Sequence, residues 1–189
     1  MVKKLDLSNV KASGGDGGFT PLPEGAYVVE IVAVVDNEER EYLEVTFDVA
    51  EGEYAGYYSD EWGVAHPYAH QIKVSYKEKA LGMLKGWLEA LTASNPGFDA
   101  EAVFSAAADT PALLGMFQGR RFGMAVLMEY ADWHGKPLNN PRLDWSNAKR
   151  LTAQAVREGT FTWQKRDERH TPKERPAQVQ AVGDADIPF

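Results

Sequence analysis

Hydrophobic and polar residues alternate through the first half of the chain. In residues 42–49 (YLEVTFDV), leucine, valine, phenylalanine and valine recur at every second position, with glutamate, threonine and aspartate between them. This two-residue period is typical of a strand with one buried face. Residues 26–35 (AYVVEIVAVV) are apolar and largely β-branched, so they predict a preceding strand. The polar run DNEERE between the two segments predicts a turn.

The apolar period becomes helical after residue 76. Before that point, YYSDEW (57–62) and QIKVSY (71–76) predict a third strand or a broken pair of strands. Leucines then recur at positions 81, 84, 88 and 91, joined by a tryptophan at 87, until SNPG ends the run. Ser75 and Glu78 have the spacing of a capping box for this helix. The alanine-rich residues 99–114 predict a shorter second helix.

Strand character returns in the last third of the chain. Residues 120–130 (RRFGMAVLMEY) predict a fourth strand, 131–140 (ADWHGKPLNN) a loop, and 141–146 (PRLDWS) a fifth strand. Residues 147–159 predict one or two amphipathic helical turns.

Five short strands with a helix between the third and the fourth are the layout of an OB-fold, a small, partly open barrel. The fold expected over residues 26–158 is therefore mainly β, a five-stranded OB-fold-like barrel with an inserted helix (α+β). A β-sandwich or another α+β barrel remains an alternative.

The two ends of the chain have the composition of irregular segments. Residues 1–25 are rich in glycine and proline and predict a flexible lead-in. Residues 159–189 are polar and punctuated by proline, which predicts a disordered linker that ends in an acidic tip. Phe161 and Trp163 are apolar exceptions that either pack back on the domain or stay mobile.

Composition narrows the class of protein. The 189 residues are 44% hydrophobic, enough for one substantial core, and they contain no apolar run long enough to span a membrane and no export signal. The absence of cysteine excludes disulfides and thiolate zinc sites and fits a reducing compartment. The net charge of −8 lies within residues 1–150, because residues 151–189 hold six basic and six acidic residues. A polyanion would therefore need a local cluster of cations.

The chain ends in GDADIPF, which combines acids with an apolar terminus. Phe189 offers a ring and a carboxylate that a pocket flanked by arginine or lysine can capture, and Ile187 adds apolar contact. Pro188 restricts the backbone, while Asp184 and Asp186 favour approach to basic partners. These five residues are the predicted partner-binding site.

DADIPF resembles the acidic tip of bacterial single-stranded-DNA-binding proteins, in which an OB domain is followed by a disordered linker. The body, with PLPEGAYVVEIV, YLEVTFDVAEGEYAGYY and GRRFGMAVLMEY, resembles small phage proteins encoded among replication and recombination genes. The resemblance implies a phage protein in the cytoplasm of a bacterial host. It implies binding of single-stranded DNA without strong sequence preference and recruitment of a helicase, polymerase, nuclease or recombinase through the tip.

Sequence-tolerant binding of single-stranded DNA needs cations for the phosphates and aromatic rings for stacked bases. The cations cluster around residues 73–79 and at 120–121. The predicted nucleic-acid-binding residues are Tyr58, Trp62, Lys73, Tyr76, Lys77, Arg120, Arg121, Tyr130 and Trp133. Each aromatic ring could instead belong to the core, and the lysines could be the solvated start of the helix.

Other functions are weighed against this prediction. A non-DNA-binding adaptor that occupies host sites for the bacterial tail fits the acidic body. An enzyme is not expected, although scattered acids such as Asp60 and Glu129 could chelate magnesium. A metal shared by His66 and His70 is disfavoured by the irregular stretch between them. No cofactor and no membrane contact are expected, and self-association into a homo-oligomer stays open.

Overall fold

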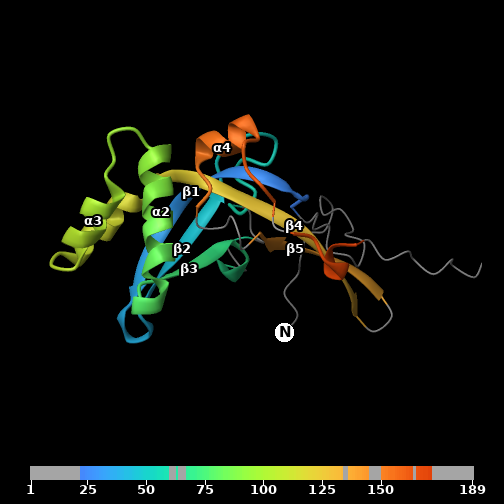
Figure 1. The fold of residues 1–189 in the computed structure, drawn as a ribbon, viewed down its shortest axis with the longest axis horizontal. Coiled ribbons are helices and arrows are strands. Elements are labelled where there is room, and N and C mark those ends of the chain that lie inside the picture. The colour runs from blue at the N-terminus through green and yellow to red at the C-terminus, as the bar shows by residue number, and fades with distance from the viewer. Residues whose placement is uncertain are drawn as a thin grey trace, which may run out of the picture.

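A computed structural model describes residues 22–59, 63, 67–133, 136–144, 150–163 and 165–171 (Figure 1). Its strands are β1 (Gly25–Asn37), β2 (Tyr42–Val49), β3 (Gln71–Ser75), β4 (Arg121–Trp133) and β5 (Lys136–Leu143). The α-helices are α2 (Leu81–Ser94), α3 (Ala100–Ala107) and α4 (Ala153–Glu158). Short 3-10 turns are η1 (Glu38–Arg40), η2 (Pro67–His70), η3 (Glu78–Ala80), η4 (Pro111–Phe117) and η5 (Glu168–His170).

The five strands form one antiparallel sheet in the order β3-β2-β1-β4-β5. Strands β1, β2 and β3 are consecutive, and β4 returns through the helices to lie beside β1, which is a Greek-key connection. Strand β5 then pairs with β4. The sheet curls into a half-barrel with α2 and α3 packed together on one side of it (Figure 1). The predicted element order is therefore confirmed.

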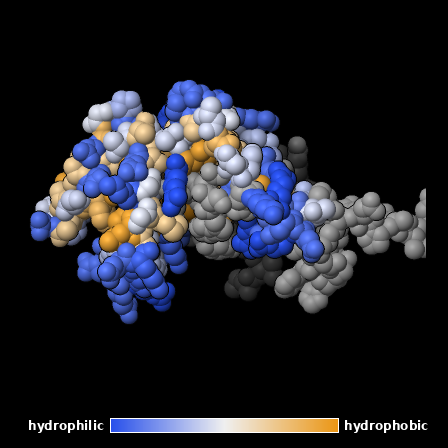
Figure 2. Space-filling model, in the orientation of Figure 1, coloured by the Kyte–Doolittle hydropathy of each residue, from blue (hydrophilic) through white to orange (hydrophobic). Residues whose placement is uncertain are grey.

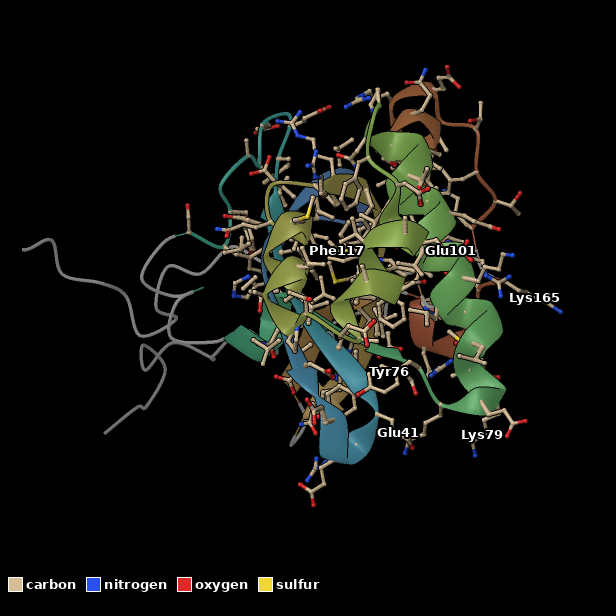
Figure 3. All side chains as sticks on the ribbon, turned by 90° about the vertical axis from the view of Figure 1, so that its left-hand side faces the viewer. Glu41, Tyr76, Lys79, Glu101, Phe117 and Lys165 are labelled. Atoms are coloured by element: carbon tan, nitrogen blue, oxygen red, sulfur yellow. The ribbon has the colours of Figure 1, made fainter. Side chains whose placement is uncertain are left out.

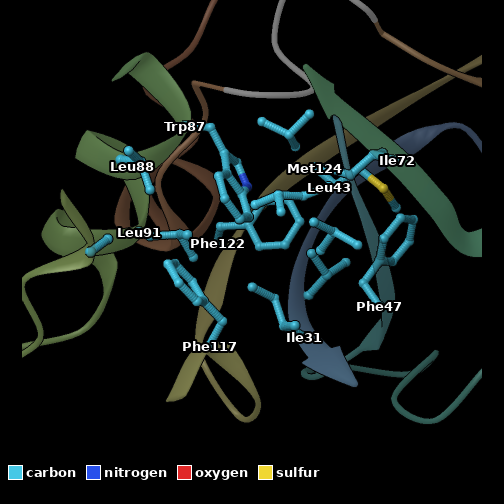
Figure 4. Packing of buried hydrophobic residues seen from close by; sticks show 14 of the residues in the cluster. Ile31, Leu43, Phe47, Ile72, Trp87, Leu88, Leu91, Phe117, Phe122 and Met124 are labelled. Atoms are coloured by element: carbon cyan, nitrogen blue, oxygen red, sulfur yellow. The ribbon is translucent and has the colours of Figure 1, made fainter. Parts of the chain in front are cut away.

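The inner face of the sheet carries the core (Figure 4). Strand β2 is buried at every second residue, as its alternation predicts. The leucine stripe of α2 packs against this face, with Leu84, Leu88 and Leu91 buried. Trp87 from the same helix stacks on Phe117 of η4, with ring centroids 5.6 Å apart. Strands and helices are thus held together mainly by apolar burial.

The opposite, outer face of β1 and β4 is covered by α4. Residue 123 of β4 has to be glycine there, because a Cβ atom would lie 2.6 Å from Leu151 Cγ and 2.7 Å from the Thr152 carbonyl oxygen. The Gly123 N–H donates to the Leu151 carbonyl at 2.7 Å. The close approach that buries Val28 and Ala125 therefore depends on this glycine.

The edge of β4 is satisfied where β5 does not reach it. The Asn95 side chain accepts from the Arg121 N–H at 2.9 Å and donates to the Arg121 carbonyl at 2.8 Å, as a neighbouring strand would do. The Asp144 N–H donates to the Ala125 carbonyl at 2.8 Å. These bonds satisfy backbone groups of β4 along the part of the strand that has no neighbouring strand on this side.

Several local predictions are wrong, and one of them concerns the start of the long helix. Ser75 and Glu78 form no capping box, because α2 begins only at Leu81, after η3. The Ser75 hydroxyl donates to the Glu41 carbonyl at 3.2 Å and accepts from the Lys77 N–H at 3.3 Å instead. Because Ser75 is the last residue of β3, its hydroxyl bonds to Glu41 in the adjacent β1–β2 turn and does not cap the helix.

Another wrong prediction is the loop over residues 131–140. Strand β4 continues to Trp133 and β5 begins at Lys136, so residues 131–133 and 136–140 belong to two paired antiparallel strands. Its asparagines and prolines have loop character, but β5 is an edge strand, where Pro137 and Pro141 are tolerated.

Part of the predicted linker is held against the domain. Residues 165–171 include η5, which packs near β4, and His170 in it is buried. Arg166 pairs with Glu24, and Arg169 lies 3.7 Å from Glu129. Phe161 and Trp163 pack on each other, with ring centroids 5.1 Å apart.

Hydrophobic surface gathers over α2 and α3 on the side shown in Figure 2. Leu81 and Met83 contribute to the exposed apolar surface of α2, with 48% and 40% of their area accessible. None of the helices among the described residues combines the length and apolarity needed to cross a membrane.

Replacing Gly123 by alanine is expected to lower the free energy of unfolding by about 1–3 kcal/mol, because the new methyl group overpacks the contact with residues 151–156. Gly82→Ala is the matched control, since a Cβ atom there would meet nothing within 4 Å outside the backbone of its own helix and its chain neighbours. That change should stabilise α2 by up to about 1 kcal/mol. Urea unfolding measures both, and equal effects of the two variants would contradict the tight contact.

Candidate nucleic-acid interface

Part of the outer face lies away from α4, because α4 packs on β1 and β4. It is formed by the second half of β1 together with β2 and β3, and we call it the open face. Its side chains alternate with the core residues, and they include the apolar side chain of Val35, which is 59% exposed. The open face consists of Ala33, Val35, Asn37, Tyr42, Glu44, Thr46, Gln71, Lys73 and Ser75.

Tyr42 and Lys73 form a cation–aromatic pair on the open face. The Lys73 Nζ lies 5.0 Å from the centroid of the Tyr42 ring. The Tyr42 hydroxyl donates to Glu44 Oε1 at 3.2 Å and accepts from Asn37 Nδ2 at 3.3 Å, which fixes the ring on the sheet. A fixed ring beside an ammonium group can accept a stacked base and an adjacent phosphate.

Among the predicted residues whose side chains the structure describes, Lys73 is the one that lies on this face. Tyr42 was not among the predicted residues, although the alternation of YLEVTFDV contains the signal. Tyr42 lies in phase with Glu44 and Thr46, the outward positions of β2, whereas the buried positions begin at Leu43.

An ion-pair network marks the boundary between the open face and α4. Arg121 of β4 contacts Glu30 at 3.3 Å and Glu51 at 3.0 Å, and Arg157 of α4 contacts Glu51 at 2.7 Å. The hydrogen bond from Arg157, with the nearby charge of both arginines, lowers the pKa of Glu51. Arg121, a predicted phosphate contact, is thus occupied by acids of the protein itself.

Tyr58 is a correction, because its ring lies in the core. Only 8% of the residue is accessible, and the ring stacks on His70 at a centroid distance of 4.7 Å and meets Phe47 edge-on. Burial raises the pKa of its hydroxyl. A buried ring cannot stack on a base in this conformation, so Tyr58 fits the core alternative.

Tyr76 lies on the helical side of the sheet (Figure 3). Its hydroxyl donates to Asp36 Oδ1 at 2.9 Å, and its ring centroid is 6.4 Å from that of Phe104 in α3. Burial and then the Asp36 bond raise the pKa of Tyr76 to about 12. Lys77 is exposed next to it, at the start of the helical layer. This pair therefore does not share a face with Lys73.

The other predicted residues are dispersed. The Arg120 guanidinium lies 4.3 Å from the Phe98 ring centroid, and its Nε donates to the Met116 carbonyl at 3.1 Å, among the helical elements. Tyr130 is half-buried on β4.

Several predicted side chains lie outside the described residues. Trp133 ends β4, but its side chain is one of these. Trp62 and the tip residues Asp184, Asp186, Ile187, Pro188 and Phe189 also lie outside the described residues.

A groove of about 530 Å³ lies between α2 and residues 150–152. Its walls include Gly86, Ala90 and Thr152, and Lys85, Arg150 and Glu89 bring mixed charge. It contains none of the predicted site residues. Across the described parts of the chain, no three histidine or acidic residues gather as metal ligands would.

Comparison with known proteins gives no relative: no protein-family model matches the chain, and no curated protein sequence does.

Glu51→Gln is expected to lower the free energy of unfolding at pH 7 by at most about 1 kcal/mol, because the network is partly exposed. The lowered pKa of Glu51 means that the folded state favours the carboxylate. Its contribution is therefore present above the ordinary glutamate pKa, about 4.3, and is lost as the pH falls further.

Urea unfolding of Glu51→Gln and the parent protein between pH 7 and pH 3 tests this. Glu53→Gln is the matched control, since Glu53 is exposed in the same turn and no ion pair of it is found among the described residues. A difference between parent and Glu51→Gln that stays constant with pH would argue against the network.

Proposed function

We propose that the protein is an OB-fold protein that binds single-stranded DNA on the open face and recruits replication or recombination proteins through its C-terminal tip. The observation that carries the first half is the Greek-key order β3-β2-β1-β4-β5 with the helices inserted between β3 and β4. A five-stranded, partly open Greek-key barrel is the OB architecture, which binds oligonucleotides on the face of its second and third strands. The open face lies on β2 and β3.

The side chains of the open face are better suited to stacking on bases than to binding phosphates by charge. Tyr42 and Val35 offer an aromatic and an apolar surface, and Thr46 and Gln71 add neutral hydrogen-bonding groups. The charges of Lys73 and Glu44 cancel. Bases would be held by stacking, which tolerates any sequence because every base has a π-face.

The second half of the proposal rests on the residues of the tip. Asp184 and Asp186 favour a basic partner surface, and Ile187, Pro188 and Phe189 supply an apolar anchor with restricted backbone freedom. A binding segment joined to a DNA-binding domain raises the local concentration of its partner at the DNA.

The adaptor without DNA binding is the second candidate. It is favoured by the net charge of −8 and by the pairing of Arg121 with Glu30 and Glu51. In that case the tip alone would carry the function.

Tyr42→Ala and Lys73→Glu should weaken binding of a fluorescent oligo-dT, measured by anisotropy at several salt concentrations. Loss of stacking should cost about 1–3 kcal/mol of binding free energy per base. Lys73→Glu should also flatten the dependence of log K on log salt by about 0.7, one phosphate contact.

Lys165→Glu is the matched control, with the same change in charge. Lys165 is exposed and projects from the right-hand side of the molecule in Figure 3. Circular dichroism verifies that each variant is folded. Equal affinity of Lys73→Glu and Lys165→Glu would exclude the open face, and failure of the parent to bind at low salt would favour the adaptor.

Deletion of residues 184–189 should abolish capture of partner proteins and leave the affinity for oligo-dT unchanged or higher, because the removed acids compete with phosphates for cations. Pull-down from a bacterial host extract and anisotropy measure the two effects. A deletion protein that binds DNA more weakly would contradict the separation of the two sites.

A further inference from the structure

Arg121 and Arg157 converge on a single carboxylate. Arg157 donates through Nε to Glu51 Oε2 at 3.0 Å and through Nη2 to Oε1 at 2.7 Å. Arg121 donates through Nη1 to the same Oε1 at 3.0 Å and through Nε to Glu30 Oε2 at 3.3 Å. The carboxylate is held in the bidentate manner in which guanidinium groups also hold phosphate.

The network is exposed enough for exchange. The side chains of Arg121 and Arg157 are 42% and 43% accessible, and that of Glu51 is 32% accessible. Exposed ion pairs contribute little net stability, so the pairing leaves both arginines available to a better anion. Their guanidinium groups come from β4 and α4, whereas Glu51 lies on the turn after β2 and can swing out without moving a strand.

The arginines lie where a strand of DNA would leave the open face. Arg121 stands beside Glu30 and Asp48 in one row across β4, β1 and β2, and Lys73 stands in a parallel row of the same face with Glu44. Strand spacing and rise place the two cations on the order of 20 Å apart. A single strand of DNA that crosses β3, β2 and β1 would pass Lys73 on one side of the open face and Arg121 on the other.

We infer that Arg121 and Arg157 form a phosphate-binding site at the border of the open face, and that Glu51 occupies it until a nucleic-acid phosphate displaces the carboxylate. The inference rests on the proposed function for the source of the phosphate. Glu51 then sets the affinity, because each binding event has to break its bonds to the two arginines. Glu30 keeps Arg121 oriented throughout.

Glu51→Gln tests the inference by removing the competing charge. Its dissociation constant for oligo-dT should fall about three- to tenfold below that of the parent, and log K should fall more steeply with log salt, by about 0.7 for each phosphate gained. Glu53→Gln removes the same charge two residues away and should change the dissociation constant less than about twofold. Equal gains in the two variants would overturn the inference, since bulk charge would explain both.

The double variant Glu51→Gln/Arg157→Gln assigns the gain to the site. It should return to the affinity and the salt dependence of the parent, with its fold verified by thermal melting. A double variant that keeps the full gain would overturn the role of Arg157.

Sodium tripolyphosphate separates this inference from the proposed function. In Glu51→Gln, it should shift the side-chain Nε–H NMR signals of Arg121 and Arg157, and in Glu53→Gln it should shift them only at higher concentration. If no variant binds oligo-dT but these signals shift, DNA binding is wrong and the anion site stands. If the signals do not respond in Glu51→Gln, the anion site is wrong, whatever happens with DNA.

Discussion

Burial of β1 on both faces is the constraint on which the rest of the structure depends. Val29 packs into the core on the inner face of the sheet, whereas its neighbour Val28 is buried on the face covered by α4. The second contact exists only because Gly123 lets residues 151–156 approach β4 closely. Since α4 is short and its place is fixed by this contact, it covers β1 and β4 and leaves the outer side of β2 and β3 without a described helix. The position of the open face follows from packing.

The distribution of charge on the outer face follows from the same separation between the part that α4 covers and the open face. Next to α4, the arginines of β4 and of the helix are neutralised by Glu30 and Glu51, which satisfies charges that are only half exposed. Farther from the helix, Lys73 is balanced by Glu44. The described residues therefore present no uncompensated basic stripe along this face. Under the proposed function, affinity for a polyanion would have to come from stacking and from exchange of internal ion pairs.

The sequence predicts the features of this protein that depend on local periodicity. The strand β2 is confirmed over its whole length, and the leucine stripe of α2 is confirmed from Leu84 onward, whereas Leu81 is exposed. The capping box failed because Ser75 bonds to Glu41, which lies 34 residues earlier. Likewise, Glu51 and Arg157 are 106 residues apart, and no local pattern joins them. The sequence therefore predicted Lys73 on the open face and Arg121 at its border, without the acids that pair with Arg121. Tyr42 could have been added from the outward phase of its strand.

A protein with this charge distribution should respond to salt in two opposed ways. A net charge of −8 repels DNA at long range, and salt screens that repulsion over about 8–10 Å. Under the proposed function, contacts of Lys73 or Arg121 with phosphates would release counterions, so salt would weaken these contacts. Because few cations face the open side and base stacking is insensitive to salt, the two effects largely offset each other. The affinity for DNA should therefore depend less steeply on salt than that of a basic groove. A shallow slope would still be compatible with binding of a single strand at the open face.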